Sequence, residues 1–202
     1  MADAASVVVG CEGRRPGRPR SARADRAIID ATTELYAERG LDGLTMEAVA
    51  ARAGVSKATL YRRYPCKIDL VMAAVTGFTA EEAPHLDTGT TRGDLRAIVA
   101  GLVHLVGATI AGRIIPMMVA EIHRNRELSD ASHRFIARRR AATAAAVRRG
   151  IARGDIRADA DVDLLVDLIA APVFYRHLVS GSPLDGDFVD RLVDTVLSAA
   201  AP

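Results

Sequence analysis

The seven residues KATLYRR, at positions 57–63, concentrate hydrogen-bond donors in one short segment. If the segment is helical, Leu60 points inward and five longer or polar side chains point outward, namely Lys57, Thr59, Tyr61, Arg62 and Arg63. Guanidinium, ammonium and hydroxyl donors arranged in this way bind phosphate oxygens and base edges of duplex DNA. A solvated helical face is the alternative interpretation, and the elements that flank the segment favour DNA.

Two short helices joined by a tight turn are predicted to position these donors. Thr45 is a suitable N-cap for a helix that ends near residue 53, and Ser56 is a suitable N-cap for a helix over residues 57–64. Gly54 lies between them and permits the sharp turn at which the second helix crosses the first. The pattern is typical of a helix-turn-helix, whose second helix enters the major groove.

The same region resembles the DNA-binding signature of TetR-family transcriptional regulators. The resemblance rests on TMEAVAARAGVSKATLYRRYPCKIDL, residues 45–70, and on AIIDATTELYAERG, residues 27–40, which is similar to the first helix of that family. The agreeing positions are Thr45, Ala50, Ala53, Gly54, Val55, Ser56, Thr59, Leu60, Tyr61, Tyr64, Lys67 and Leu70. The resemblance implies a homodimeric transcriptional repressor that binds a palindromic operator.

Individual side chains acquire roles through this resemblance. It implies phosphate contacts for Thr45, Ser56, Tyr61 and Lys67. It implies contacts with bases for Lys57, Ala58, Thr59 and Arg62. Arg63 stands where the family commonly has histidine or tyrosine, and we expect it to add a phosphate or base contact. Cys66 replaces a frequent serine, so we expect a weaker cap on the helix that follows.

Positive charge is concentrated in the first third of the chain. Residues 14–67 hold twelve Lys or Arg against six Asp or Glu, a net charge of +6, whereas the whole chain carries +2. Residues 1–20 lack periodicity and end in RRPGRPR, so we expect a flexible basic arm. Arg18 and Arg20 of this arm are expected to reach an A·T minor groove, and a solubilising tail is the alternative.

Composition excludes several other classes of protein. Two cysteines cannot form a disulfide framework, and no apolar run of about 18 residues lacks a charge, so we expect a soluble, cytoplasmic protein with no membrane partner. The histidines do not have the paired spacing of metal ligands, and the chain has no nucleophile elbow, phosphate-binding glycine loop or HExxH pair. We therefore expect no metal, no cofactor and no enzyme activity.

The predicted fold is all-α, with a three-helix helix-turn-helix domain followed by a larger helical bundle. Domain bounds are expected at residues 21–66 and 67–202. Apolar periodicity and capping residues predict about nine helices, over residues 22–39, 46–53, 57–64, 67–80, 94–110, 113–124, 130–153, 160–180 and 186–199.

The last two predicted helices are apolar on more than one face, which suggests a second copy of the chain as a partner. The segment RGDIRADADVDLLVDLIAAPVFYRHLVSGSPLD also resembles the C-terminal domain of one TetR-family branch, in which these helices dimerise. The expected interface residues are Val162, Val166, Ile169, Val173, Phe188, Leu192 and Val196. An ordinary intramolecular core is the alternative.

Family resemblance further implies a small apolar effector among the middle helices. The candidate pocket residues are Phe78, His104, Met117, Met118, Phe135, Phe174 and Tyr175, because methionine adapts to ligands and aromatic rings stack on them. Plain core packing is the alternative for each of them. Two rival functions remain open at this point: an activator or nucleoid-like DNA binder without a ligand, and a ligand-binding protein that does not bind DNA.

Overall fold

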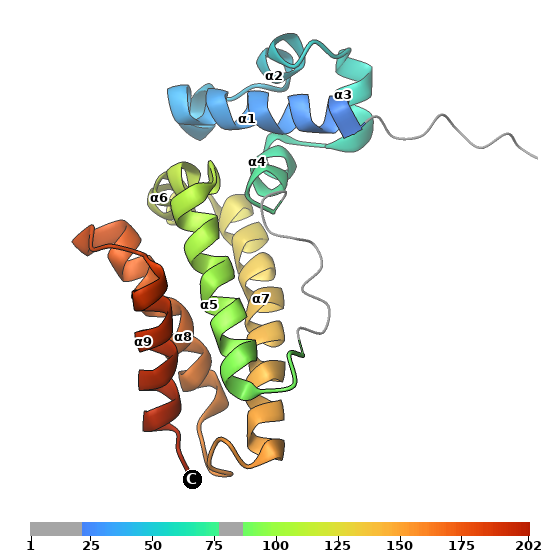
Figure 1. Ribbon diagram of the computed structural model, residues 1–202. Coiled ribbons are helices and arrows are strands. Elements are labelled where there is room, and N and C mark those ends of the chain that lie inside the picture. The colour runs from blue at the N-terminus through green and yellow to red at the C-terminus, as the bar shows by residue number, and fades with distance from the viewer. Residues whose placement is uncertain (1–21, 77–86) are drawn as a thin grey trace, which may run out of the picture.

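The computed structural model describes residues 22–76 and 87–202, and all regular structure in these ranges is helical (Figure 1). The elements are α1 (Ala22–Gly43), α2 (Met46–Arg52), α3 (Lys57–Arg63), α4 (Lys67–Thr76), α5 (Thr91–Ala108), α6 (Ala111–Ile122), α7 (Arg126–Arg153), α8 (Val162–Tyr175), the π-helical turn η1 (Arg176–Ser180) and α9 (Gly186–Ala199). The all-α prediction is confirmed. Figure 1 shows α1, α2 and α3 at one end of the molecule and the long helices of the bundle beneath them.

Two apolar clusters form the core. The first joins α1, α2 and α3 to α4, α6 and the start of α7, with Ile28, Leu35, Leu60, Val71, Ile114 and Leu128 fully buried. The second joins α5 to α8 and α9, with Leu95, Val99, Ile169, Val173 and Val193 at its centre. Because α4 packs within the first cluster, the expected domain boundary at residue 66 crosses a continuous core, and the division into two domains stays a prediction.

Helix ends are set by the residues that satisfy their backbone groups. Gly40 has φ 67°, a left-handed conformation that interrupts α1 where the sequence predicted its end, and one more helical turn continues to Gly43. Asn125 accepts a hydrogen bond from the Leu128 N–H at 2.9 Å, so α7 begins four residues before its predicted start. The predicted helix over residues 160–180 is divided into α8 and η1.

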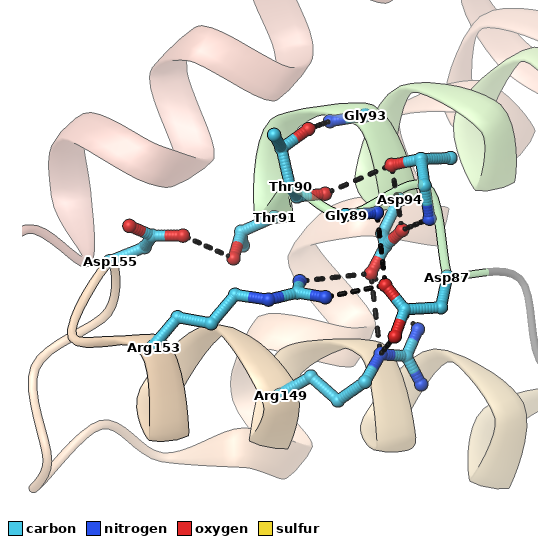
Figure 2. A network of polar contacts seen from close by, with 10 residues as sticks. Asp87, Gly89, Thr90, Thr91, Gly93, Asp94, Arg149, Arg153 and Asp155 are labelled. Carbon is cyan, nitrogen blue, oxygen red and sulfur yellow. Dashed lines mark hydrogen bonds and ion pairs between the residues drawn. The ribbon is translucent and has the colours of Figure 1, made fainter.

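A buried carboxylate ties the start of α5 to the end of α7 (Figure 2). The side chain of Asp94 is 0% exposed and accepts hydrogen bonds from the Thr88 N–H at 2.6 Å and from the Arg149 guanidinium at 3.0 Å. Arg153 approaches the same carboxylate at 3.3 Å and also pairs with Asp87. Burial alone raises the pKa of Asp94, but these donors outweigh it, and the net pKa is lowered.

The junction of α5 and α6 is a bend of 88°. A Cβ on Gly112 would lie 1.9 Å from the Val106 carbonyl oxygen, so only glycine permits this close approach. By length and apolar composition, the bent pair together is long enough to cross a membrane, and no single helix within residues 22–76 and 87–202 is.

Candidate nucleic-acid interface

The turn between α2 and α3 has the geometry that its sequence predicts. Thr45 caps α2 by accepting a hydrogen bond from the Ala48 N–H at 3.1 Å. Gly54 adopts φ 65°, and the next N–H, that of Val55, donates to the Ala50 carbonyl at 3.0 Å. This left-handed cap ends α2 and directs the chain into α3.

Helix α3 is anchored on one side and open on the other. Ser56 caps it by accepting from the Thr59 N–H at 3.2 Å, and the two hydroxyl oxygens lie 2.9 Å apart. Leu60 is 0% exposed and packs in the first cluster, whereas Tyr61 is 46% exposed and Arg62 is exposed. The exposed side of α3 therefore carries a short row of hydrogen-bond donors that face away from the protein, as a recognition helix requires.

Lys57 forms an ion pair with Glu47 of α2, at 3.2 Å between Nζ and Oε1. The Glu47 backbone N–H, and after it Lys57, lower the pKa of this carboxyl group. Both side chains are more than half exposed, so the pair contributes little to stability. Lys57 can therefore exchange its partner for a DNA group at small cost.

Arg63 is placed differently from the expectation. Its guanidinium is 17% exposed and pairs with Asp25 of α1, so its charge is already neutralised within the protein. Arg52 likewise holds Glu38 of α1 through two contacts of 2.7 and 3.1 Å. These two pairs orient α2 and α3 on α1, and the DNA contact expected for Arg63 stays a prediction.

The remaining candidates for DNA contact lie at the start of α4 or outside the described residues. Lys67 donates from Nζ to the Leu41 carbonyl at 2.9 Å, which joins the start of α4 to the end of α1. An ammonium group has three N–H donors, so this bond leaves Lys67 able to bind a phosphate. Arg18 and Arg20 fall within residues 1–21, outside the part of the chain that the structure describes.

Those expected pocket residues that the structure describes are divided between the two apolar clusters and the surface. Met117, Met118 and Phe135 pack in the first cluster, and Phe174 packs in the second. Tyr175 is 60% exposed, His104 is exposed, and Phe78 lies outside the described residues. The described candidates therefore lie in different parts of the bundle, and the pocket stays a prediction.

An open depression of about 460 Å³ lies between α5 and the start of α9. Among the expected pocket residues within the described ranges, only His104 lines it, beside Arg96, Val103, Leu184, Asp185 and Val189. Across the described ranges, no group of three or more His, Cys, Asp or Glu residues has the arrangement of a metal site.

The expected dimer residues are buried within the single chain. Val166, Ile169, Val173, Phe188, Leu192 and Val196 are each at most 9% exposed, and Val162 is partly buried against the second cluster. The alternative of an intramolecular core is therefore correct for this stripe. A different set of apolar side chains on α8 and η1 is exposed: Leu164, Leu168, Tyr175, Leu178 and Val179.

Both parts of the chain match known families. Residues 28–74 match the family described as "Bacterial regulatory proteins, tetR family", and residues 85–196 match "Tetracyclin repressor-like, C-terminal domain". An uncharacterised HTH-type transcriptional regulator of Mycobacterium tuberculosis is 34% identical over 183 residues, covering 90% of this chain and 88% of the relative. The DNA-binding transcriptional repressor TetR of Mycobacteroides abscessus is 33% identical over 182 residues, covering 90% and 93%.

Solved structures share the architecture. The TetR family transcription regulator SCO0332 is 34% identical, has a TM-score of 0.65, and is aligned over 89% of this chain and 100% of its own. The Bacillus subtilis regulator FadR, solved in complex with stearoyl-CoA, is 18% identical with a TM-score of 0.64 over 86% and 97%, and shows similarity of fold. The chain therefore belongs to the TetR family of HTH-type, DNA-binding transcriptional regulators, a family of proteins that are not enzymes.

Proposed function

We propose that this protein is a cytoplasmic homodimeric repressor that binds a palindromic operator through α3 and is released by a small effector. The observation that carries the proposal is the two-sided character of α3, with Leu60 fully buried and Tyr61 and Arg62 exposed. A repressor rather than an activator is supported by the Mycobacteroides abscessus relative, which is named as one.

Contacts with DNA divide into two groups in this proposal. Thr45, Ser56, Tyr61 and Lys67 bind phosphates, because they lie at helix starts or carry one polar group on an exposed stem. Lys57, Ala58, Thr59 and Arg62 face the bases, with Arg62 as the one guanidinium on the exposed side of α3. The basic arm, with Arg18 and Arg20, adds affinity from the minor groove.

Dimerisation is proposed through the exposed face of α8. Leu164, Leu168, Tyr175 and Leu178 recur at intervals of three to seven residues along α8 and η1, so they share one side, and each is at least 38% exposed. An apolar stripe of this length is self-complementary when two copies pack about a two-fold axis. A two-fold dimer presents two copies of α3 to two half-sites of a palindrome.

An effector site within the bundle is proposed from the similarity of fold to FadR, which was solved in complex with stearoyl-CoA. This likeness is compatible with a ligand within the bundle. Such a ligand releases DNA only if it binds the non-DNA geometry more tightly.

A selection of genomic DNA fragments with the purified full chain tests the proposed function. We expect enrichment of a palindromic site, with an affinity that falls steeply as salt is raised, because phosphate contacts release counterions. No enrichment would favour the ligand-binding protein that does not bind DNA. Specific DNA binding that no small molecule changes would favour the activator or nucleoid-like binder.

Arg62→Ala and Tyr61→Phe are expected to affect DNA binding differently. Loss of a base-reading guanidinium should cost about 1–3 kcal/mol on the selected operator and relax preference at one base position. Loss of the Tyr61 hydroxyl should weaken binding to all DNA sequences to the same extent, because a phosphate contact carries no sequence information. Fluorescence anisotropy with operator variants measures both effects, and a uniform loss in both proteins would contradict the assignment of Arg62.

The double substitution Leu164→Glu/Leu168→Glu should produce a monomer. Four carboxylates would be brought together at the two-fold contact, and the operator affinity should fall by at least about tenfold because two half-sites are no longer linked. Sedimentation at micromolar concentration measures the association state. Val119→Glu is the matched control, since Val119 is 44% exposed on α6, and a monomeric control would point to a different interface.

A further inference from the structure

A hydrogen bond joins the π-helical turn η1 to the first turn of α6. Nε2 of His177 lies 2.8 Å from the carbonyl oxygen of Gly112, in a partly buried position. A carbonyl oxygen can only accept a hydrogen bond, so Nε2 carries the hydrogen and is the donor. The bond links two residues 65 positions apart, at the place where the chain has just turned from α5 into α6.

The acceptor of this bond has lost its ordinary partner within α6. In an α-helix a carbonyl oxygen accepts from the N–H four residues later, and for Gly112 that residue is Pro116, which has no N–H. Gly112 is buried, and its close approach to the Val106 carbonyl fixes it against α5. A buried carbonyl without a partner is costly, and the side chain of His177 supplies the missing donor.

The turn η1 depends on polar contacts of this kind for its position. None of residues 176–180 is buried, so apolar packing holds the turn only weakly. Arg176 lies over the Phe188 ring at 4.0 Å and donates to the Pro183 carbonyl, which ties the turn to the start of α9. His177 supplies the tie to α6. The turn is also π-helical, a rare geometry that recurs at functional positions.

The two ends of the bond lie on parts of the protein that have different proposed roles. His177 stands between Tyr175 and Leu178, which are 60% and 38% exposed and belong to the proposed dimer face. Gly112 lies in the first turn of α6, whose Ile114 packs in the first cluster with α1 and α4. The bond is therefore a direct connection from the proposed dimer face, through α6, to the helices that support α3.

We propose that His177 is a positioning residue that fixes the separation of the two α3 helices in the dimer, and with it the half-site spacing that the protein selects. This rests on the proposed function, because it assumes the dimer and the palindrome. Half-site spacing follows from the geometry between the two-fold contact and each recognition helix. With the bond in place, η1 is held on α6. Without it, η1 can shift while α6 stays in its core, and the two copies of α3 sample a range of separations.

Operators that differ only in half-site spacing test the proposal. Fluorescence anisotropy compares the selected palindrome with versions lengthened or shortened by one and two base pairs. His177→Phe keeps a ring and removes the donor, and we expect its preference for the selected spacing to fall by about fivefold, the change in equilibrium that one hydrogen bond supports. Its affinity for a single half-site should be unchanged. His177→Gln, whose side-chain amide can donate in place of Nε2, should restore the preference.

His133→Phe is the matched control, since His133 is exposed on α7, and it should keep the spacing preference of the natural protein. The proposal is wrong if His177→Phe keeps the full preference or if His177→Gln does not regain it. An equal loss of affinity at every spacing and at a single half-site would also contradict it, because that is the effect of a merely structural role.

A double-mutant cycle with Pro116→Ala tests the bond without DNA. This substitution restores an N–H four residues after Gly112, which can satisfy that carbonyl from within α6. His177→Phe should therefore lower the melting temperature by less in the Pro116→Ala background than in the natural one. Equal losses in the two backgrounds would overturn the proposal, even if His177→Phe is too unstable for operator binding to be measured.

Operator binding by the natural protein separates this inference from the proposed function. If the natural protein selects a palindrome at one spacing and His177→Phe selects it equally well, only the positioning role is wrong. If the natural protein binds no operator, the proposed function fails, and the positioning role fails with it whatever the cycle shows.

Discussion

Asp94→Asn should lower the free energy of unfolding by roughly 3 kcal/mol, because it leaves two arginines beside a buried neutral amide. The carboxylate is 0% exposed and holds Arg149, Arg153 and the Thr88 backbone together. For a chain of this length the melting temperature should fall by roughly 6–12 °C. Calorimetry at pH 7 measures the loss.

The effect of Asp94→Asn should also depend on pH. Since the folded-state pKa of Asp94 is lowered, its contribution is fully present above the unfolded-state value of about 3.9 and is lost as the pH falls through the folded-state value. The difference in unfolding free energy between the variant and the natural protein should therefore begin to narrow as the pH falls below about 3.9. Asp190→Asn is the control, because Asp190 pairs with Arg96 at an exposed site and should change stability by less than about 1 kcal/mol. Equal losses of unfolding free energy in the two variants would contradict the argument that burial makes the Asp94 ion pairs more stabilising than the exposed pair of Asp190.

Leu60→Ala should remove operator binding while destabilising the chain by about 2–5 kcal/mol. Leu60 is fully buried and is the apolar residue that fixes α3 in the first cluster, so its truncation leaves a cavity beneath the recognition helix. Anisotropy with the selected operator and thermal melting measure the two effects. Ile136→Ala is the control, since Ile136 is 46% exposed and its truncation creates no cavity. Full operator affinity in Leu60→Ala would show that this packing does not position α3.

The helix-turn-helix could be predicted from sequence because its determinants are local. Thr45, Gly54 and Ser56 each act on backbone groups within five residues, and the structure has the predicted caps and turn. The pairing of Arg63 with Asp25 could not be predicted in this way, because the two residues are 38 positions apart. A basic residue on a short exposed helix looks the same in sequence whether its partner is DNA or α1.

The C-terminal helices show a second limit of predictions that rest on apolar periodicity. The spacing of Val166, Ile169 and Val173 correctly indicates a buried stripe, but it does not say which surface buries it. In the structure α5 and α9 cover that stripe, and the apolar residues left over, Leu164 and Leu168, are the exposed ones.

The first cluster joins α1, α2 and α3 to the helical bundle, and this affects how these three helices can move relative to the bundle. Ile28 and Leu35 of α1 share one core with Val71 of α4 and Ile114 of α6, and the bond from Lys67 to the Leu41 carbonyl crosses the same joint. The three DNA-binding helices therefore have no separate core on which to fold or rotate alone. Because these helices share buried contacts with α4, we expect a displacement of α4 to move them together rather than to be absorbed by a hinge.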